Sequence, residues 1–129
     1  MSGKRILIVD DNTANLELTS TLLHHEGYET RTALDAQAAL EVLETFHPEL
    51  ILMDIQLPGM DGLELTEKLK SDPKTKNITI VALTAYSSQR DRENAFRAGC
   101  DGYETKPIDT QTFPAIVRHY LDISGSHAA

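Results

Sequence analysis

Short apolar runs alternate along the chain with segments whose apolar residues recur at helical spacing. Three runs are continuous and rich in isoleucine, leucine and valine, namely Ile6–Val9, Leu50–Met53 and Ile80–Leu83. This composition is typical of strands that are buried on both faces of a parallel sheet. Two weaker strand candidates, Glu29–Ala33 and Tyr103–Thr105, contain polar residues and are better suited to the edges of a sheet.

The first helical segment, Thr13–Glu26, carries Ala14, Leu18 and Leu22 at four-residue steps, and Gly27 follows as a suitable C′ residue. The spacing predicts that these three apolar side chains share one face. Four further helices are predicted from caps and apolar faces. They are a helix capped by Asp35 with the face Ala36, Ala39, Leu40 and Leu43; Asp61–Ser71 with Leu65 and Leu69; a charged helix capped by Ser87 or Ser88 and ending at Gly99; and a last helix with Phe113, Ile116, Val117, Tyr120 and Leu121 on one face.

The order of elements is therefore a strand followed by a helix, five times over. Such alternation predicts a doubly wound α/β fold, with a five-stranded parallel sheet and helices on both faces. Because the three apolar strands belong in the centre, we expect the strand order 2-1-3-4-5. We interpret residues 1–129 as one domain with a core over about 5–121 and a frayed tail over 122–129.

Composition and charge exclude several classes of function. The chain has 12 Lys and Arg against 20 Asp and Glu, a net charge of −8, which argues against direct binding to nucleic acid. Its longest apolar runs have four residues, too short for a membrane span or a signal peptide, so we expect a cytoplasmic protein. The single cysteine, Cys100, excludes an internal disulfide, and its place at a helix end favours a packed side chain.

The residues that follow the strands carry the candidate chemistry. Asp10 and Asp11 follow the first strand, Asp54 the third, Thr84 the fourth and Lys106 the fifth. In open parallel sheets, the carboxyl ends of the strands form the binding site. Any one of these residues could simply mark a strand that ends in water. Five such residues at one edge of the sheet predict a binding site there.

Three clustered carboxylates repel one another unless a cation lies between them. Mg²⁺, or Mn²⁺ in its place, is a hard divalent ion that suits oxygen ligands and retains several waters. Lys106 would add a second positive centre, and a metal ion with a lysine is an arrangement that holds a phosphoryl group. An aspartate can itself form an acyl phosphate. These residues alone do not say which aspartate is attacked.

Four motifs at these positions resemble the receiver domain of two-component response regulators. The resemblance runs from about Arg5 to Leu121, and each motif is weak alone but specific in this order and spacing. The motifs are residues 6–12 (ILIVDDN), 50–62 (LILMDIQLPGMDG), 81–85 (VALTA) and 99–107 (GCDGYETKP). The resemblance implies the flavodoxin-like (βα)5 fold and a signalling switch rather than an enzyme with a separate substrate.

The resemblance also implies a role for each site residue. Asp54 is the expected phospho-acceptor, and Asp11, Asp54 and the backbone carbonyl of Gln56 are expected to bind the metal ion. Asp10 is expected to act through a metal-bound water. Lys106 and Thr84 are expected to contact the phosphoryl oxygens.

Three further expectations follow from the same resemblance. Tyr103 matches the switch position, whose ring turns inward when Thr84 moves toward the phosphoryl group. Gln56 and Tyr86 occupy positions that tune the lifetime of that group, and the ring of Tyr86 is expected to hinder the attacking water. The Lys106–Pro107 peptide bond is expected to be cis.

The implied partners are a sensor histidine kinase or a histidine phosphotransfer protein, and a downstream protein that is not identified by the sequence. We expect a monomer or a dimer that depends on phosphorylation, and no membrane contact. We expect the switched surface to be formed by the fourth helix, the last strand and the last helix. No effector segment follows Leu121, so the chain is interpreted as a stand-alone regulator, a phosphorelay shuttle or a piece of a hybrid kinase.

Three alternative functions compete with this interpretation. A phosphohydrolase with an aspartate nucleophile would place that nucleophile after the first strand and would need room for a cap. A flavin-binding module would need a hydroxyl- and glycine-rich loop where Asp10 and Asp11 lie. A degenerate receiver that only binds partners would not need Asp54, Thr84 and Lys106 intact.

Overall fold

The computed structural model contains five parallel strands that alternate with helices, as predicted. It describes residues 4–55, 57, 59–85, 88–106 and 109–128, with side chains as far as residue 122. Each strand lies where its pattern predicts, within one residue at either end. The strands are β1 (Arg5–Val9), β2 (Glu29–Ala33), β3 (Leu50–Asp54), β4 (Thr79–Thr84) and β5 (Gly102–Thr105).

The sheet has the order β2-β1-β3-β4-β5, with every neighbouring pair parallel, which confirms the predicted topology. The register brings the carboxyl ends of the central strands level. Val9 lies opposite Met53, and Asp54 lies opposite Leu83. At the edge of the sheet, Thr84 pairs with Thr105. Residues that follow the strands therefore meet at one edge of the sheet.

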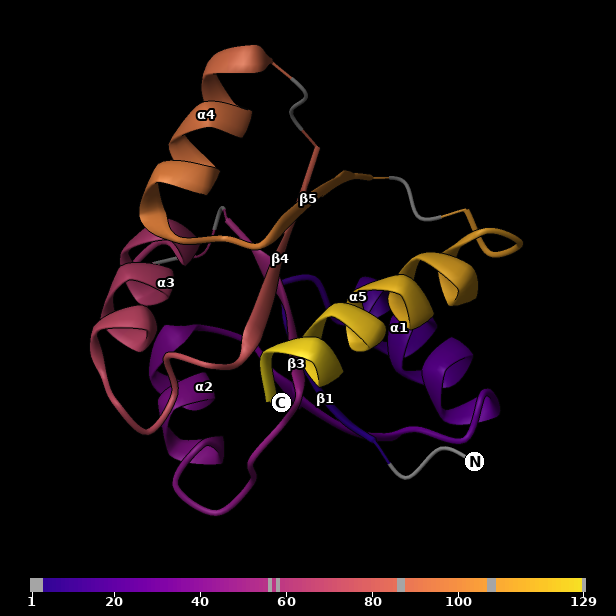
Figure 1. Ribbon diagram of the computed structural model, residues 1–129. Coiled ribbons are helices and arrows are strands. Elements are labelled where there is room, and N and C mark those ends of the chain that lie inside the picture. The colour runs from indigo at the N-terminus through magenta and orange to yellow at the C-terminus, as the bar shows by residue number, and fades with distance from the viewer. Residues whose placement is uncertain (1–3, 56, 58, 86–87, 107–108, 129) are drawn as a thin grey trace.

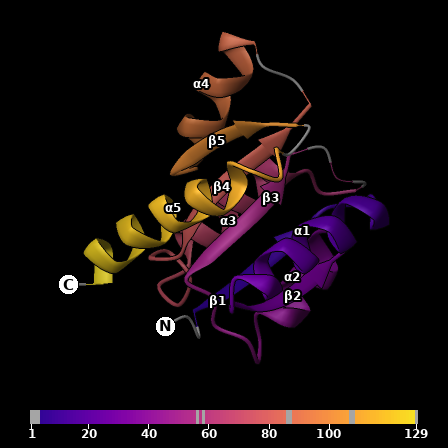
Figure 2. The same ribbon diagram turned by 90° about the vertical axis from the view of Figure 1, so that its right-hand side faces the viewer.

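Helices cover both faces of this sheet (Figures 1 and 2). One layer contains α1 and α5, and the other contains α2, α3 and α4. The side chains of the central strands alternate between two buried clusters, so that Leu7 and Ile51 pack toward the second layer while Ile8 and Leu52 pack toward the first. The helices are α1 (Thr13–His25), α2 (Ala36–Val42), α3 (Gly62–Ser71), α4 (Gln89–Ala98) and α5 (Phe113–Ala128).

Side-chain caps define where four of these helices begin. Asn12, Asp35, Asp61 and Ser88 each accept a hydrogen bond from the backbone N–H three residues further on, which satisfies a donor that the first turn leaves free. Of the two serines proposed for α4, Ser88 is thus the cap, and Ser87 lies outside the described residues.

Two details of the helices differ from the prediction. In α1 the buried residues are Leu16, Thr19 and Leu23, whereas Leu18, predicted on the apolar face, is 42% exposed. The segment offers two overlapping leucine stripes, and packing against the sheet selects the one that contains a threonine. The second difference is that α5 continues through the predicted tail to Ala128. No proline interrupts that segment, and a single glycine in a helix costs only about 1 kcal/mol.

None of the helices in the described ranges has both the length and the apolar character that crossing a bilayer requires.

Candidate functional site

Three aspartates from two neighbouring strands meet at the carboxyl edge of the sheet. One carboxylate oxygen from each of Asp10, Asp11 and Asp54 lies within 4.8 Å of the others. Asp10 and Asp54 are buried and Asp11 is exposed, so the cluster is open to solvent on one side. Asp10 is held in place because its backbone N–H donates to the Ala33 carbonyl at 3.0 Å.

Lys106 brings one positive charge to these carboxylates. Its Nζ donates to Asp10 Oδ2 at 2.8 Å and to Asp54 Oδ2 at 3.2 Å. Its backbone N–H donates to the Thr84 carbonyl at 2.7 Å, which fixes the residue beyond the end of β5. Burial lowers the pKa of the Lys106 ammonium, but its hydrogen bond to Asp10 and the charge of Asp54 outweigh this effect, so the pKa of Lys106 is raised.

The four side chains carry three negative charges and one positive charge, so the cluster has a net charge of −2. One divalent cation would balance it. The candidate ligand atoms are carboxylate oxygens, which Mg²⁺ and Mn²⁺ prefer. Asp10 Oδ1 already accepts from the Asn12 N–H at 2.9 Å and its Oδ2 from Lys106, which leaves Asp10 less free than Asp11. The donor set fits a magnesium ion.

Gly62 allows α3 to begin directly against the backbone of the acid cluster. A Cβ atom at this residue would overlap the carbonyl oxygen of Asp54 and would lie 2.6 Å from the Ile55 Cα. The Gly62 N–H donates to the Ile55 carbonyl at 3.2 Å. A side chain here would displace the end of β3, so glycine is required for the position of Asp54.

Thr84 and Tyr103 form the part of the site that faces α4. Thr84 ends β4 and is fully buried, and the ring of Tyr103 on β5 is only 5% exposed. Burial and the nearby charge of Asp91 raise the pKa of the Tyr103 hydroxyl, while Arg92 and a side-chain hydrogen bond with Thr84 oppose that rise. Tyr103 therefore has its ring directed inward and its hydroxyl linked to Thr84.

Some predicted site residues lie outside the described residues. These are Gln56, proposed as a backbone ligand and tuning residue, Tyr86, proposed to hinder water, and Pro107 of the expected cis peptide bond.

Two charged contacts were not anticipated from the sequence. The guanidinium of Arg92, on the helix that the sequence predicts to be charged, lies over the Tyr103 ring at 5.1 Å from its centroid. At the opposite end of the sheet, Lys70 Nζ binds Asp101 Oδ2 at 2.9 Å. No short-range signal marks either pair, because each joins residues from different elements.

The packed role predicted for Cys100 is confirmed. Its side chain is buried, and its Sγ lies 3.9 Å from Thr66 Oγ1. Burial raises the pKa of the Cys100 thiol to about 11. The thiol is therefore protonated, and unreactive, near neutral pH.

Comparison with known proteins gives a consistent result. The family profile described as the response regulator receiver domain matches residues 6–118. The polar-differentiation response regulator DivK of Brucella ovis is 40% identical over 118 residues, which cover 92% of this chain and 96% of that protein.

Solved structures agree in fold. A CheY-like response regulator receiver domain protein from Methanospirillum hungatei has a TM-score of 0.87 at 36% identity, covering 95% of this chain and 97% of that one. The receiver domain of a sensor histidine kinase from Pseudomonas aeruginosa has a TM-score of 0.84 at 32% identity, covering 93% and 98%. That domain was solved with a magnesium ion coordinated in its active-site cleft.

Proposed function

Because the chain belongs to the family of response regulator receiver domains of two-component signalling, we propose that Asp54 is its phospho-acceptor. The donor is a phosphohistidine on a sensor kinase or a phosphotransfer protein. The P–N bond of the phosphohistidine breaks, a P–O bond to a carboxylate oxygen of Asp54 forms, and the imidazole keeps the electron pair of the broken bond. The observation that carries this proposal is the sharing of Lys106 between Asp10 and Asp54.

The charge of the cluster favours Asp54 over the other two aspartates. Asp10 accepts hydrogen bonds from the Asn12 N–H and from Lys106, and its contact with Lys106 is shorter than that of Asp54. Asp11 is exposed, and within the described ranges it forms no ion pair with Lys106. Asp54 combines burial with the longer lysine contact. Its carboxylate is therefore shielded from bulk water, yet it is the one from which Lys106 can turn to an incoming phosphoryl oxygen.

Asp11 and Asp54 would hold the magnesium ion, with Asp10 acting through a bound water. When bound, the ion offsets negative charge on the carboxylates and on the phosphoryl group. Lys106 supplies the remaining positive charge. The Thr84 hydroxyl, now hydrogen-bonded toward Tyr103, would exchange that partner for a phosphoryl oxygen.

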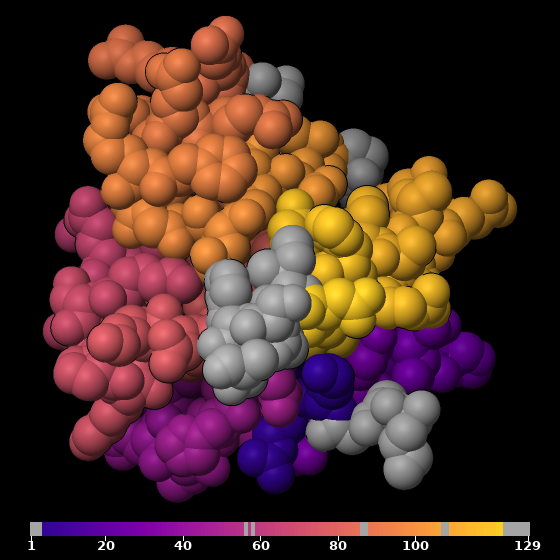
Figure 3. Space-filling model, in the orientation of Figure 1, coloured from indigo at the N-terminus to yellow at the C-terminus, as the bar shows by residue number. Residues whose placement is uncertain are grey.

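A phosphoryl group adds about −1.5 to −2 charge and strong acceptor oxygens. Thr84 and Lys106 gain these acceptors only in the phosphorylated state, so the modification biases the pair formed by Thr84 and Tyr103. We propose that the readout surface is formed by α4, β5 and α5. Phe96 on α4 is 45% exposed, and Figure 3 shows α4 at the rim of the molecule with its outer side uncovered in this view. A partner would bury this ring.

The donor would approach from the start of α1. This helix begins beside Asp11 and presents Ala14 and Leu18 outward. Exposed apolar residues beside an acidic pocket suit a partner whose phosphohistidine must be inserted into that pocket.

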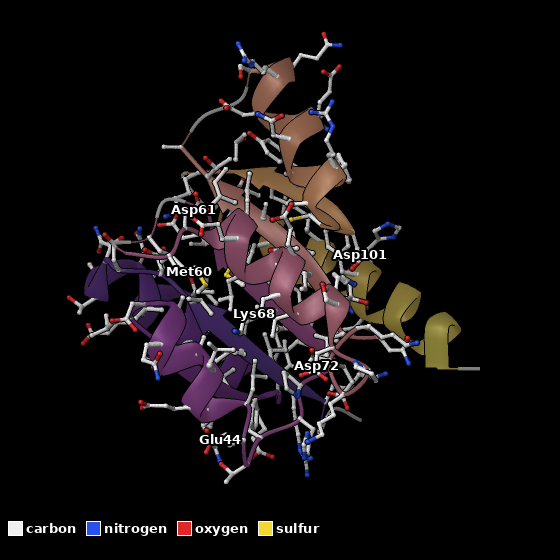
Figure 4. The ribbon with its side chains drawn as sticks, turned by 90° about the vertical axis from the view of Figure 1, so that its left-hand side faces the viewer. Glu44, Met60, Asp61, Lys68, Asp72 and Asp101 are labelled. Carbon is white, nitrogen blue, oxygen red and sulfur yellow. The ribbon has the colours of Figure 1, made fainter. Side chains whose placement is uncertain are left out.

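The test is intact-mass spectrometry after incubation with acetyl phosphate and Mg²⁺. We expect one phosphoryl adduct on the wild type, and none without Mg²⁺ or in Asp54→Ala. The matched control is Asp61→Asn, at an aspartate of the same sheet edge (Figure 4) whose capping role asparagine preserves. No adduct on the wild type would indicate a receiver that only binds partners, and an adduct on Asp54→Ala would identify another aspartate as the acceptor.

A further inference from the structure

The side chain of Arg92 lies against the ring of Tyr103, where the surface of α4 meets β5. The guanidinium carbon is 5.1 Å from the ring centroid, within the range of a cation–π contact. Arg92 is exposed on α4, whereas the ring beneath it is almost fully buried. Arg92 therefore covers the outer side of the Tyr103 ring.

The ring is the main partner of this guanidinium. Among the residues that the structure describes, Arg92 takes part in none of the ion pairs. The nearby acids of α4 are engaged elsewhere: Asp91 Oδ2 accepts from the Ser88 hydroxyl at 2.8 Å, and Glu93 Oε2 accepts from Gln89 at 3.1 Å. The position of Arg92 is therefore set by the aromatic face.

On its other side, Tyr103 is connected to the acid cluster. Its hydroxyl shares a side-chain hydrogen bond with Thr84, and the Thr84 carbonyl accepts from the Lys106 N–H at 2.7 Å. Lys106 in turn binds Asp10 and Asp54. A continuous series of contacts thus runs from the outer surface of α4 to the phosphoryl pocket.

We propose that Arg92 is a positioning residue that holds Tyr103 inward before any phosphoryl group is present. The inference rests on the proposed function of Asp54 and extends it to regulation. Because the inward ring is the arrangement expected after phosphorylation, Arg92 shifts the resting protein toward its switched state. A cation–π contact at an exposed site changes a two-state population by about two- to five-fold.

The chain contains a matched control for this contact. The guanidinium of Arg31 lies over the Phe46 ring at 4.9 Å, and that ring is also buried. This second pair joins β2 to the segment after α2, at the opposite edge of the sheet from β5. Removing Arg31 therefore deletes the same type of contact without touching Thr84 or Tyr103. Arg97→Gln is a second control, because it removes an exposed arginine from α4 itself.

The first measurement is the ¹³C-labelled tyrosine ring spectrum of the unphosphorylated, metal-free protein, with the Tyr103 signal assigned by its loss in Tyr103→Phe. We expect Arg92→Gln to move this signal toward the position of an exposed tyrosine, corresponding to a two- to five-fold fall in the inward population. Arg92→Lys should restore part of the shift, because an ammonium also binds an aromatic face. Arg31→Gln and Arg97→Gln should leave it in place.

The second measurement is the acetyl phosphate concentration that gives half-maximal adduct. It should rise two- to five-fold in Arg92→Gln and remain unchanged when the same substitution is made in a Tyr103→Leu background. An unmoved Tyr103 signal in Arg92→Gln, or an equal shift in Arg31→Gln, would overturn the inference. The ring spectrum needs no phosphoryl group, so its result is independent of whether Asp54 is the acceptor.

Discussion

Two clusters of lysine and aspartate lie at opposite ends of the sheet, and they differ in charge balance. At the amino end of the strands, Lys70 Nζ donates to Asp101 Oδ2 at 2.9 Å and to the Ile78 carbonyl at 2.8 Å. The same Asp101 oxygen accepts from the Ile80 N–H at 2.9 Å. This cluster pairs one cation with one anion and completes its hydrogen bonds with backbone groups. Asp101 is labelled in Figure 4.

At the carboxyl end, Lys106 faces three carboxylates, and two negative charges are left over. The lysines of the two clusters are equally buried, with side-chain exposures of 20% for Lys70 and 18% for Lys106, so burial of the cation does not distinguish the clusters. Charge balance does. A neutral, fully bonded cluster joins elements of the fold, whereas an unbalanced cluster leaves negative charge that a cation can balance.

The largest expected effect is on the balanced cluster. Asp101→Ala leaves the Lys70 ammonium without its counterion and the Ile80 N–H without an acceptor. We expect the free energy of unfolding to fall by about 2–3 kcal/mol, less than the 3–5 kcal/mol of a fully buried pair because both side chains are about one-fifth exposed. Urea denaturation measures this. Arg118→Gln, which removes the exposed pair with Glu26, should cost less than about 0.5 kcal/mol, and an equal loss in both variants would contradict the distinction.

The second effect tests whether the other cluster is completed by a metal ion. Mg²⁺ at one hundred times its dissociation constant should stabilise the wild type by about 2.7 kcal/mol, since it binds only the folded state. Thermal unfolding with and without Mg²⁺ measures this gain. It should persist in Asp101→Ala and decrease strongly in Asp11→Asn, which lacks a ligand. Equal gains in the two variants would show that Mg²⁺ binds elsewhere.

A smaller effect of opposite sign is expected at the acid cluster in the absence of metal. Asp11→Asn removes a like charge beside Asp10 and Asp54, so in EDTA the variant should be more stable than the wild type by about 0.5–1 kcal/mol. Because Asp11 is exposed, the gain should shrink when the salt concentration rises. A loss of stability in low salt would mean that the three carboxylates do not repel one another.

The smallest effect concerns pH. The pKa of Lys106 is raised above its ordinary value of 10.5, so its stabilising contribution is complete below pH 10.5 and is lost only as the pH rises through the higher folded-state pKa. Lys106 therefore stays charged between pH 8 and pH 10. We expect the rate of adduct formation from acetyl phosphate to show no decline over this range that is attributable to Lys106. The measurement is that rate for the wild type and for Lys106→Arg, whose charge persists at higher pH. A decline confined to the wild type would contradict the raised pKa.

Local signals were sufficient for the sheet and for the helix starts. Continuous apolar runs identify β1, β3 and β4 as central strands, because only a strand covered on both faces can be apolar throughout. Asp35 and Asp61 mark helix starts through a bond to a backbone N–H three residues away. The clustering of acids then follows from topology, since parallel strands end at the same edge.

Features that depend on long-range packing could not be predicted from local sequence signals. The predicted buried face of α1 was wrong. Leu16 and Leu23 compete with Leu18 for contact with the sheet, and only the assembled core decides which of them is buried. The contact of Arg92 with Tyr103 joins a charged helix to an edge strand, and a single sequence shows both residues without showing that they touch.

The contacts of Lys106 also have a consequence for the biosynthesis of the protein. They join residues 52 and 96 positions apart, and the ammonium follows β5, the last strand to be synthesised. A nascent chain that ends at β4 already contains every carboxylate of the cluster but lacks the cation that they share. Chains are made from the amino terminus and domains fold as units, so the pocket closes only when the sheet is complete. An unfinished chain therefore lacks one of the groups that the proposed transfer of a phosphoryl group to Asp54 requires.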